Sequence, residues 1–272
     1  MPVNLPLPEI PPGLKIIDSH AHVVKEYFQD DQDEVIGRAH DCGVVQLVNP
    51  GVVTDNIDEL LSIAGSHDFI YTSVGVHPHE ASHWTEESKR LMSAALTNER
   101  VVGVGECGLD FYYNHSDRQS QMHALKEQVK LALAFDKPII IHCREAWNET
   151  LDILEQEGGG KLRGVFHCFT GGPEVLPRIE GLDFYVSFSG IVTFPKSQEI
   201  QAAAALVRED RFLVETDCPY LAPQKVRGKR NEPAYVWWVA DKLRELRQSD
   251  LSSIAQSCCR NARALFRLPE PG

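Results

Sequence analysis

Short runs of apolar, largely β-branched residues recur along the chain, and amphipathic stretches separate them. Because these runs are continuous rather than alternating, they are typical of strands that are buried on both faces, as in a parallel sheet. The runs lie at 16–18, 44–48, 69–76, 101–105, 138–141, 164–166, 184–188 and 211–214. The pattern therefore predicts a parallel sheet of eight strands.

The intervals between the runs show the periodicity of amphipathic helices. Between 117 and 135, the residues Met122, Leu125, Val129 and Ala132 form one apolar stripe at spacings of three and four. Further helices are predicted at 55–64, 85–96, 145–157, 197–207, 232–247 and 251–268. Strands and helices thus alternate along most of the chain.

Eight strand-and-helix units over about 250 residues match a single α/β domain of the (β/α)8 or TIM-barrel type, with the active site at the C-terminal face of the strands. An open doubly wound sheet is the alternative, but no glycine fingerprint follows the first run. We expect an irregular, proline-rich lead-in at 1–15 and one barrel domain at 16–268.

Charge and composition narrow the class of partner. The 272 residues carry a formal net charge of −12, which excludes a generally basic surface for nucleic acid. A polyanionic substrate would have to meet a local basic patch or bound cations. No apolar run approaches the roughly 18 residues of a membrane helix, and the N-terminus does not have the pattern of a signal peptide. The seven cysteines are not spaced like those of a small disulfide-linked domain, so we expect free thiols and a cytoplasmic location. We also expect a monomer without a membrane partner.

Imidazoles and carboxylates gather where the predicted strands end, which is the face that carries the active site in a barrel. His20 and His22 lie two residues apart, so on a strand they point to the same side and can converge on one ion. The complete predicted ligand set is His20, His22, Glu106, His142, His167 and Asp217. These residue types suit zinc, manganese or iron. Six ligands exceed the need of one tetrahedral ion, so the set predicts two ions with Glu106 able to bridge them.

Two alternatives to this interpretation need weighing. A single histidine at a strand end is commonly a packed core residue, and only the shared placement of several favours a metal site. Four cysteines directly follow proposed ligands and suggest a Cys/His zinc site; they are Cys107, Cys143, Cys168 and Cys218. Neighbouring residues of a strand face opposite ways, so we expect these thiols to face the helix layer.

These motifs resemble those of the TatD-type metal-dependent deoxyribonucleases, within the amidohydrolase-like barrel superfamily. The matching segments are IIDSHAH at 16–22, GVHPHE at 75–80, VGECGLDFYY at 104–113, PIIIHCREA at 138–146, GVFHCFTGG at 164–172, VETDCPYLAP at 214–223, GKRNEPAYV at 228–236 and NARALF at 261–266. The resemblance covers nearly the whole chain. It implies cleavage of phosphodiester bonds in DNA, often as a 3′-to-5′ exonuclease on single strands or 3′ ends, with magnesium, manganese or zinc.

The resemblance also implies roles for the ligand set. One divalent ion would be held by His20, His22, Glu106 and Asp217. A second would be held by Glu106 together with His142 and His167. His77 is similar to an active-site histidine of the family that lies beside the metals.

The chemistry of single residues suggests further roles. Asp217 is the candidate for the general base or orienting group of a metal-activated water, and pure ligation is its alternative. His77 could donate to a phosphate oxygen or to the leaving group. Arg144 suits a bidentate phosphate contact, against an ordinary place at a helix start. Asp110 and Tyr112 follow Glu106 and could line a groove where Tyr112 stacks on a base, although ordinary packing is its alternative.

Other charged residues near the predicted face have two interpretations each. Lys225, Arg227 and Arg230 lie in the basic segment after the eighth run, where they could contact backbone phosphates or belong to a solvated loop. Glu215 shares a face with Asp217, so it could hydrogen-bond a ligand histidine or form an ion pair inside the barrel.

Three classes of function remain open at this point. The first is a two-metal phosphodiesterase that acts on DNA. The second is a hydrolase of small amides or lactones on the same barrel; many such sites bridge their metals with a modified lysine at the end of strand four, where this chain has Glu106. The third is a non-catalytic binding module, which six intact ligand candidates disfavour.

Overall fold

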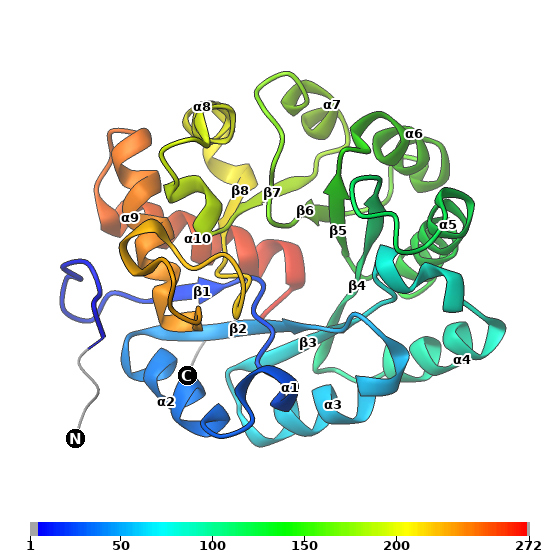
Figure 1. The fold of residues 1–272 in the computed structure, drawn as a ribbon, viewed down its shortest axis with the longest axis horizontal. Coiled ribbons are helices and arrows are strands. Elements are labelled where there is room, and N and C mark those ends of the chain that lie inside the picture. The colour runs from blue at the N-terminus through cyan, green and yellow to red at the C-terminus, as the bar shows by residue number, and fades with distance from the viewer. Residues whose placement is uncertain (1–4, 271–272) are drawn as a thin grey trace.

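The computed structural model describes residues 5–270 and confirms the single-domain (β/α)8 barrel (Figure 1). Residues 1–4 of the expected lead-in lie outside the described residues. All eight strands pair in parallel and follow one another in chain order. They are β1 (Ile16–Asp18), β2 (Val44–Pro50), β3 (Ile70–Val74), β4 (Val101–Asp110), β5 (Ile139–Arg144), β6 (Gly164–Phe166), β7 (Tyr185–Phe188) and β8 (Phe212–Val214).

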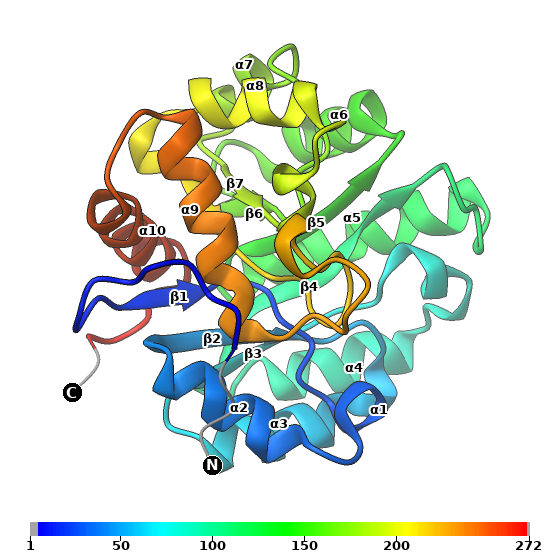
Figure 2. The same cartoon turned by 60° about the vertical axis from the view of Figure 1, so that its left-hand side comes forward.

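Helices surround the strands, as two directions of view show (Figures 1 and 2). They are α1 (Lys25–Phe28), α2 (Gln32–Asp41), α3 (Ile57–Ser66), α4 (Glu86–Ala95), α5 (Arg118–Ala134), α6 (Trp147–Gly158), α7 (Leu176–Gly181), α8 (Gln198–Leu206), α9 (Val236–Leu246) and α10 (Leu251–Phe266). The seven helices expected from periodicity are all present. The short helices α1 and α7 and the longer α2 had not been predicted.

Hydrogen bonds from the residue that follows β1 join the first and last strands of the barrel. The backbone N–H of Ser19 donates to the carbonyl oxygen of Val214 at 3.1 Å, and the Ser19 hydroxyl donates to the same oxygen at 3.0 Å. Beyond these strands, the Asp217 N–H donates to the His20 carbonyl at 2.9 Å. The segments after β1 and β8 are therefore bound to each other at the C-terminal face of the barrel.

Alternation along the strands explains why the apolar runs are continuous. Ile139 and Ile141 of β5 belong to the large apolar cluster shared with the helices, whereas Ile140 belongs to a second cluster with residues of other strands. That second cluster also contains Leu265 and Phe266 of α10. His142 lies two residues after Ile140, so it shares the inward face. The barrel interior is thus apolar toward α10 and polar toward the C-terminal ends of its strands.

Strand β4 continues five residues beyond the predicted end at 105, because a β-bulge interrupts its pairing without ending it. Val104 pairs with Ile139 and Cys107 with Ile141, so three steps along β4 match two along β5. Val104 and Cys107 consequently both face the outer apolar cluster. Glu106, the residue before Cys107, is directed to the interior.

Among residues 5–270, no helix combines the length and the apolar character that a bilayer crossing requires.

We predict that Gly75→Ala destabilises the barrel at the β3–β4 contact. A Cβ atom at Gly75 would lie 2.8 Å from the Glu106 nitrogen and closer still to the backbone of Gly105. We expect a loss of about 1–3 kcal/mol in the free energy of unfolding, as for other overpacked cores. Chemical denaturation would measure this loss.

Gly65→Ala is the matched control, because Gly65 lies in α3 with no atom within 4 Å of an added Cβ. It should be neutral or stabilise by roughly 0.5–1 kcal/mol. Equal stability of the two variants would contradict the tight approach of β3 to the bulge.

Candidate metal centre

The buried carboxylate of Glu106 lies at the centre of the site. Its Oε2 atom lies 3.2 Å from Nε2 of His20 and 3.7 Å from Nε2 of His22. Asp217 completes this side, with its Oδ1 atom 3.7 Å from Nε2 of His20 and 3.6 Å from Nε2 of His22. The two Nε2 atoms are themselves 3.2 Å apart, so these side chains converge on one point.

The other oxygen of Glu106 faces a different group of histidines. Its Oε1 atom lies 2.8 Å from Nε2 of His167, 3.1 Å from Nε2 of His77 and 3.1 Å from Nδ1 of His142. The two oxygens of one carboxylate therefore point toward two separate sets of imidazoles. All six side chains of the predicted ligand set, and His77 with them, meet at this site.

The side chains fit divalent cations by their donor geometry. Within residues 5–270, three groups of side chains place their donor atoms within 4.8 Å of one another. They are His20 with His22 and Asp217, His77 with Glu106 and His142, and His20 with His167 and Glu215. The buried Nδ1 of His20 and both ring nitrogens of His167 have no hydrogen-bond partner among the described residues. Although His167 approaches Glu106 closely, that contact lacks hydrogen-bond geometry, which leaves ring nitrogens available as metal ligands.

Burial and charge act against each other at this centre. Burial raises the pKa of Glu106, but the neighbouring charges of His167 and His77 outweigh it and hold that pKa well below the usual range. Burial lowers the pKa of His167, but Glu106 raises it more, so the pKa of His167 lies above its ordinary value. Burial lowers the pKa of His77 to about 4. A buried carboxylate in such surroundings requires a compensating positive charge.

Asp110 connects the centre to the chain that follows β4. Its Oδ2 atom lies 3.1 Å from Nε2 of His142 and 3.0 Å from Nε2 of His79. Its Oδ1 atom accepts hydrogen bonds from the backbone N–H groups of Tyr112 and Tyr113 at 3.0 and 2.9 Å. The sequence suggested only a groove-lining residue here. Asp110 is instead buried at the end of β4, and its carboxylate orients both a histidine ring and a loop.

Glu215 lies beside another histidine of the centre. Its Oε1 atom is 3.4 Å from Nδ1 of His167 and accepts a hydrogen bond from the Cys168 N–H at 2.6 Å. Glu215 therefore lies beside a histidine of the ligand set at ion-pair distance, but the expected hydrogen bond between them is not formed among the described residues.

Three of the four cysteines lie as expected. Cys107, Cys143 and Cys218 are buried in the apolar cluster shared with the helices, and Sγ of Cys143 lies 3.5 Å from the Thr150 hydroxyl of α6. The expectation for Cys168 is wrong. Because β6 ends at Phe166, strand alternation no longer applies, and Cys168 has a left-handed φ of 41° with its Sγ 3.2 Å from the Ser189 hydroxyl.

The candidate substrate contacts lie in two places, at the end of β5 and in the segment after β8. Arg144 ends β5, and its guanidinium carbon lies 4.3 Å from the ring centroid of Tyr112 and 5.0 Å from that of Tyr113. Within residues 5–270 its guanidinium contacts these two rings and forms no ion pair with a carboxylate.

The basic segment after β8 is less uniform than the sequence suggested. Lys225 and Arg227 are exposed, and Arg227 lies over the ring of Phe194 at 4.8 Å. Arg230 instead forms an ion pair with Asp31 and lies 4.4 Å from the ring centroid of Phe28. Of the three basic candidates, Arg230 is thus already engaged by the chain itself.

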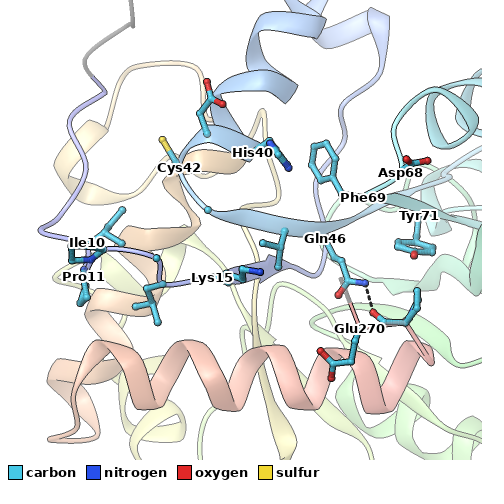
Figure 3. Close-up of a pocket in the computed structure, with 17 residues that line it drawn as sticks. Ile10, Pro11, Lys15, His40, Cys42, Gln46, Asp68, Phe69, Tyr71 and Glu270 are labelled. Carbon is cyan, nitrogen blue, oxygen red and sulfur yellow. Dashed lines mark hydrogen bonds between the residues drawn. The ribbon is translucent and has the colours of Figure 1, made fainter. Parts of the chain in front are cut away.

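A hollow of about 790 Å³ lies elsewhere, at the N-terminal ends of β2 and β3 (Figure 3). Lys15, His40 and Tyr71 contribute to its lining, and the Gln46 amide beside them donates to the Pro269 carbonyl at 2.8 Å. In barrels of this type the reactive groups occupy the opposite end. This hollow is therefore separate from the metal centre.

Comparisons with known proteins agree with the centre. A family model described as TatD related DNase matches residues 17–267. The chain is 38% identical over 253 residues to the uncharacterized metal-dependent hydrolase YabD of Bacillus subtilis, covering 93% of this chain and 99% of that protein. It is 33% identical over 259 residues to a protein of Erwinia tasmaniensis named 3′-5′ ssDNA/RNA exonuclease TatD, covering 93% of this chain and all of that protein. The crystal structure of YJJV, a TatD homolog from Escherichia coli K12, superposes with a TM-score of 0.87 at 28% identity, over 93% of this chain and 98% of that one.

We predict that Glu106→Gln weakens binding of Mn²⁺ by at least about 10- to 100-fold. Loss of a residue that only hydrogen-bonds a metal ligand already weakens metal affinity by about 10- to 100-fold. Glu106 faces both groups of histidines directly, so its loss should cost at least as much. Isothermal titration of the metal-stripped protein would measure the affinity, and circular dichroism would check the fold. Asp68→Asn is the control, because that carboxylate is exposed at the opposite end of the barrel. Unchanged Mn²⁺ affinity in Glu106→Gln would remove Glu106 from the centre.

Proposed function

The chain belongs to the TatD-related DNase family of metal-dependent hydrolases, and we propose that it hydrolyses phosphodiester bonds in single-stranded DNA, working from the 3′ end. One observation carries this proposal: the two oxygens of Glu106 face separate groups of imidazoles at 2.8–3.7 Å. A carboxylate in that position suits a bridge between two divalent ions, magnesium, manganese or zinc. Paired ions are a recurring means of cleaving phosphodiesters.

The charges at the centre support an anionic substrate. Two divalent cations would bring a charge of about +4, against −2 from Glu106 and Asp217, so the ions and the carboxylates that bind them would keep about +2. Asp110 and Glu215 would lie behind His142 and His167 and reduce the positive charge farther from the ions. One ion would be bound by His20, His22 and Asp217, and the second by His142 and His167, with Glu106 shared. A protein with a net charge of −12 could thereby hold a phosphodiester at a local positive region.

Individual side chains then have distinct tasks. Bound cations of this kind lower the pKa of water and stabilise the charge that develops on phosphoryl oxygens. The Asp217 carboxylate, beside His22, would orient the attacking water and accept its proton. His77, whose Nε2 lies 3.1 Å from Glu106, would donate to the departing oxygen. Arg144 would bind a phosphate of the chain, and Lys225 and Arg227 would contact phosphates farther along the strand.

Three further observations favour a nucleic acid over a small amide or lactone. Glu106 stands where many binuclear amidohydrolases have a bridging lysine, and one relative at 33% identity is named a 3′-5′ ssDNA/RNA exonuclease. The exposed ring of Tyr112 beside Arg144 also suits stacking on a base. The seven free cysteines support a reducing, cytoplasmic setting for this activity.

We predict that His142→Ala lowers the rate of nucleotide release by more than about 100-fold, because one metal loses a ligand and the remaining charge stabilises the transition state less. A time course with Mn²⁺ on single-stranded DNA labelled at its 5′ end would measure this rate. His123→Ala, an exposed histidine of α5, is the control and should retain full activity. Wild-type activity in His142→Ala would contradict the assignment.

We also predict that replacing Lys225 and Arg227 together by Ala reduces the salt dependence of DNA binding. Each lost phosphate contact on a single strand lowers the slope of log K against log salt by about 0.7, so a change of about 1.4 is expected. Fluorescence anisotropy in the His142→Ala background would measure it without hydrolysis. Arg230→Ala should change the slope less, because Arg230 is paired with Asp31. An unchanged slope in the double variant would assign Lys225 and Arg227 to a solvated loop.

A further inference from the structure

We propose that Tyr27 and Tyr220 form a base-stacking subsite on one side of the metal centre, and that Tyr112 and Tyr113 form a second subsite on the other side. A single-stranded end would then be held by two nucleobases that flank the scissile phosphodiester. This inference rests on the proposed function and extends it from Tyr112 to Tyr27, Tyr113 and Tyr220, which sequence reasoning did not single out.

Exposed aromatic rings first direct attention to these positions. Within residues 5–270 the exposed large hydrophobic side chains are Tyr112, Tyr113, Tyr220 and Leu206. Tyr112 and Tyr113 follow β4, the strand that contains Glu106, and Tyr220 follows β8 and Asp217. Each side chain is about half exposed, at 53%, 51% and 50% in that order. Half-exposed rings can stack with a ligand on the faces that the chain leaves open. The Tyr113 ring is already stacked on His115, with centroids 5.7 Å apart, so Tyr112 is the more accessible ring of its pair.

The first subsite adjoins the histidines that face Oε2 of Glu106. The rings of Tyr27 and Tyr220 meet edge to face, with centroids 5.6 Å apart at 70°. Their centroids lie 6.2 and 6.3 Å from that of His22. Tyr27 belongs to α1 and Tyr220 to the loop after β8, so two distant segments of the chain place their rings beside His22.

Buried polar contacts fix this pair relative to the metal centre. The Tyr220 N–H donates to the carbonyl of Asp217 at 3.0 Å. The buried Asn231 amide donates to the carbonyls of Tyr220 and Thr216 at 2.6 and 2.8 Å. Arg230, through its ion pair with Asp31 just beyond α1, ties the same loop to the helix that carries Tyr27. The ring positions are therefore set by the segment that presents Asp217.

The second subsite adjoins the histidines that face Oε1. Asp110 accepts hydrogen bonds from the N–H groups of Tyr112 and Tyr113 while its other oxygen contacts His142. Arg144 lies over both tyrosine rings. The two aromatic pairs thus adjoin different groups of imidazoles around Glu106. Hydrogen bonds join the Tyr112–Tyr113 backbone to Asp110 and the Tyr220 backbone to Asp217.

Two stacking subsites would favour single-stranded over double-stranded DNA, because stacking on tyrosine requires an unpaired base. Every base has a π face, so stacking on tyrosine tolerates any sequence and requires only that the base be free. A base in a duplex is already stacked and paired, and it must be separated before it can enter either subsite. A substrate with one base can occupy only one of the two subsites.

The test compares three oligonucleotides of single-stranded DNA: one unmodified, one abasic at the 3′-terminal position and one abasic at the next position. We expect Tyr220→Ala to lower kcat/KM on the unmodified strand by about 10-fold, mainly through KM, within the 5- to 150-fold range of a lost stacking contact. On the strand that lacks the base bound by Tyr27 and Tyr220, the same variant should have almost no effect. Tyr112→Ala should also lower kcat/KM on the unmodified strand. It should have almost no effect on the abasic strand that lacks the base bound by Tyr112 and Tyr113.

Tyr220→Phe keeps the ring and should restore most of the kcat/KM that Tyr220→Ala loses. Leu206→Ala, at an exposed side chain of α8, is the control and should leave kcat/KM unchanged on all three strands. An equal loss for Tyr220→Ala on all three strands would overturn the subsite, since it would indicate a general structural role. If Tyr220→Ala and Tyr112→Ala both have no effect on the same abasic strand, the two tyrosine pairs bind the same base. That result would overturn the proposal of two separate subsites.

A separate measurement of DNA binding distinguishes failure of this inference from failure of the proposed function. Anisotropy with the same three strands reports stacking whether or not hydrolysis occurs. If the wild-type protein releases no nucleotide but Tyr220→Ala still weakens binding only of strands with the relevant base, the exonuclease function fails and the subsite stands. If nucleotide release is normal and binding does not depend on Tyr220, the subsite fails and the function stands.

Discussion

The structure depends on one buried negative charge, the carboxylate of Glu106. An ionised group removed from water is very unfavourable unless opposite charge or hydrogen-bond donors surround it. Here the surrounding groups are imidazoles delivered by β1, β3, β5 and β6 or by the residues directly after them. No local segment could supply them, so the centre exists only when the sheet has closed into a barrel.

Two features of the barrel make room for this charge. The bulge between Val104 and Cys107 resets the alternation of β4, so that Cys107 packs outward and Glu106 points inward. Below Glu106 the interior is filled by alternate strand residues such as Ile140 together with α10, which makes that end apolar. The polar layer is therefore confined to the C-terminal ends of the strands, where a substrate can approach.

The loops around the site are tied to the same side chains that form it. Asp110 holds the Tyr112–Tyr113 backbone with one oxygen and His142 with the other, and Asn231 holds Tyr220 to the segment before Asp217. Such ties mean that a displacement of the metal ligands displaces the aromatic rings as well. The positions of the aromatic rings and of the candidate metal ligands are thus coupled through hydrogen bonds of the chain itself.

The sequence by itself determined the barrel and the six side chains of the ligand set. Strands buried on both faces leave continuous apolar runs, and parallel strands bring their carboxyl ends to one face, so the meeting of His20, His142 and Asp217 follows from their places in the chain. Only the tertiary structure decided the length of β4, the turn at Cys168, the double contact of Asp110 and the pairing of Tyr27 with Tyr220. A bulge, a left-handed residue and contacts between distant segments depend on register and packing across the closed sheet, and local patterns of apolar and polar residues do not encode them.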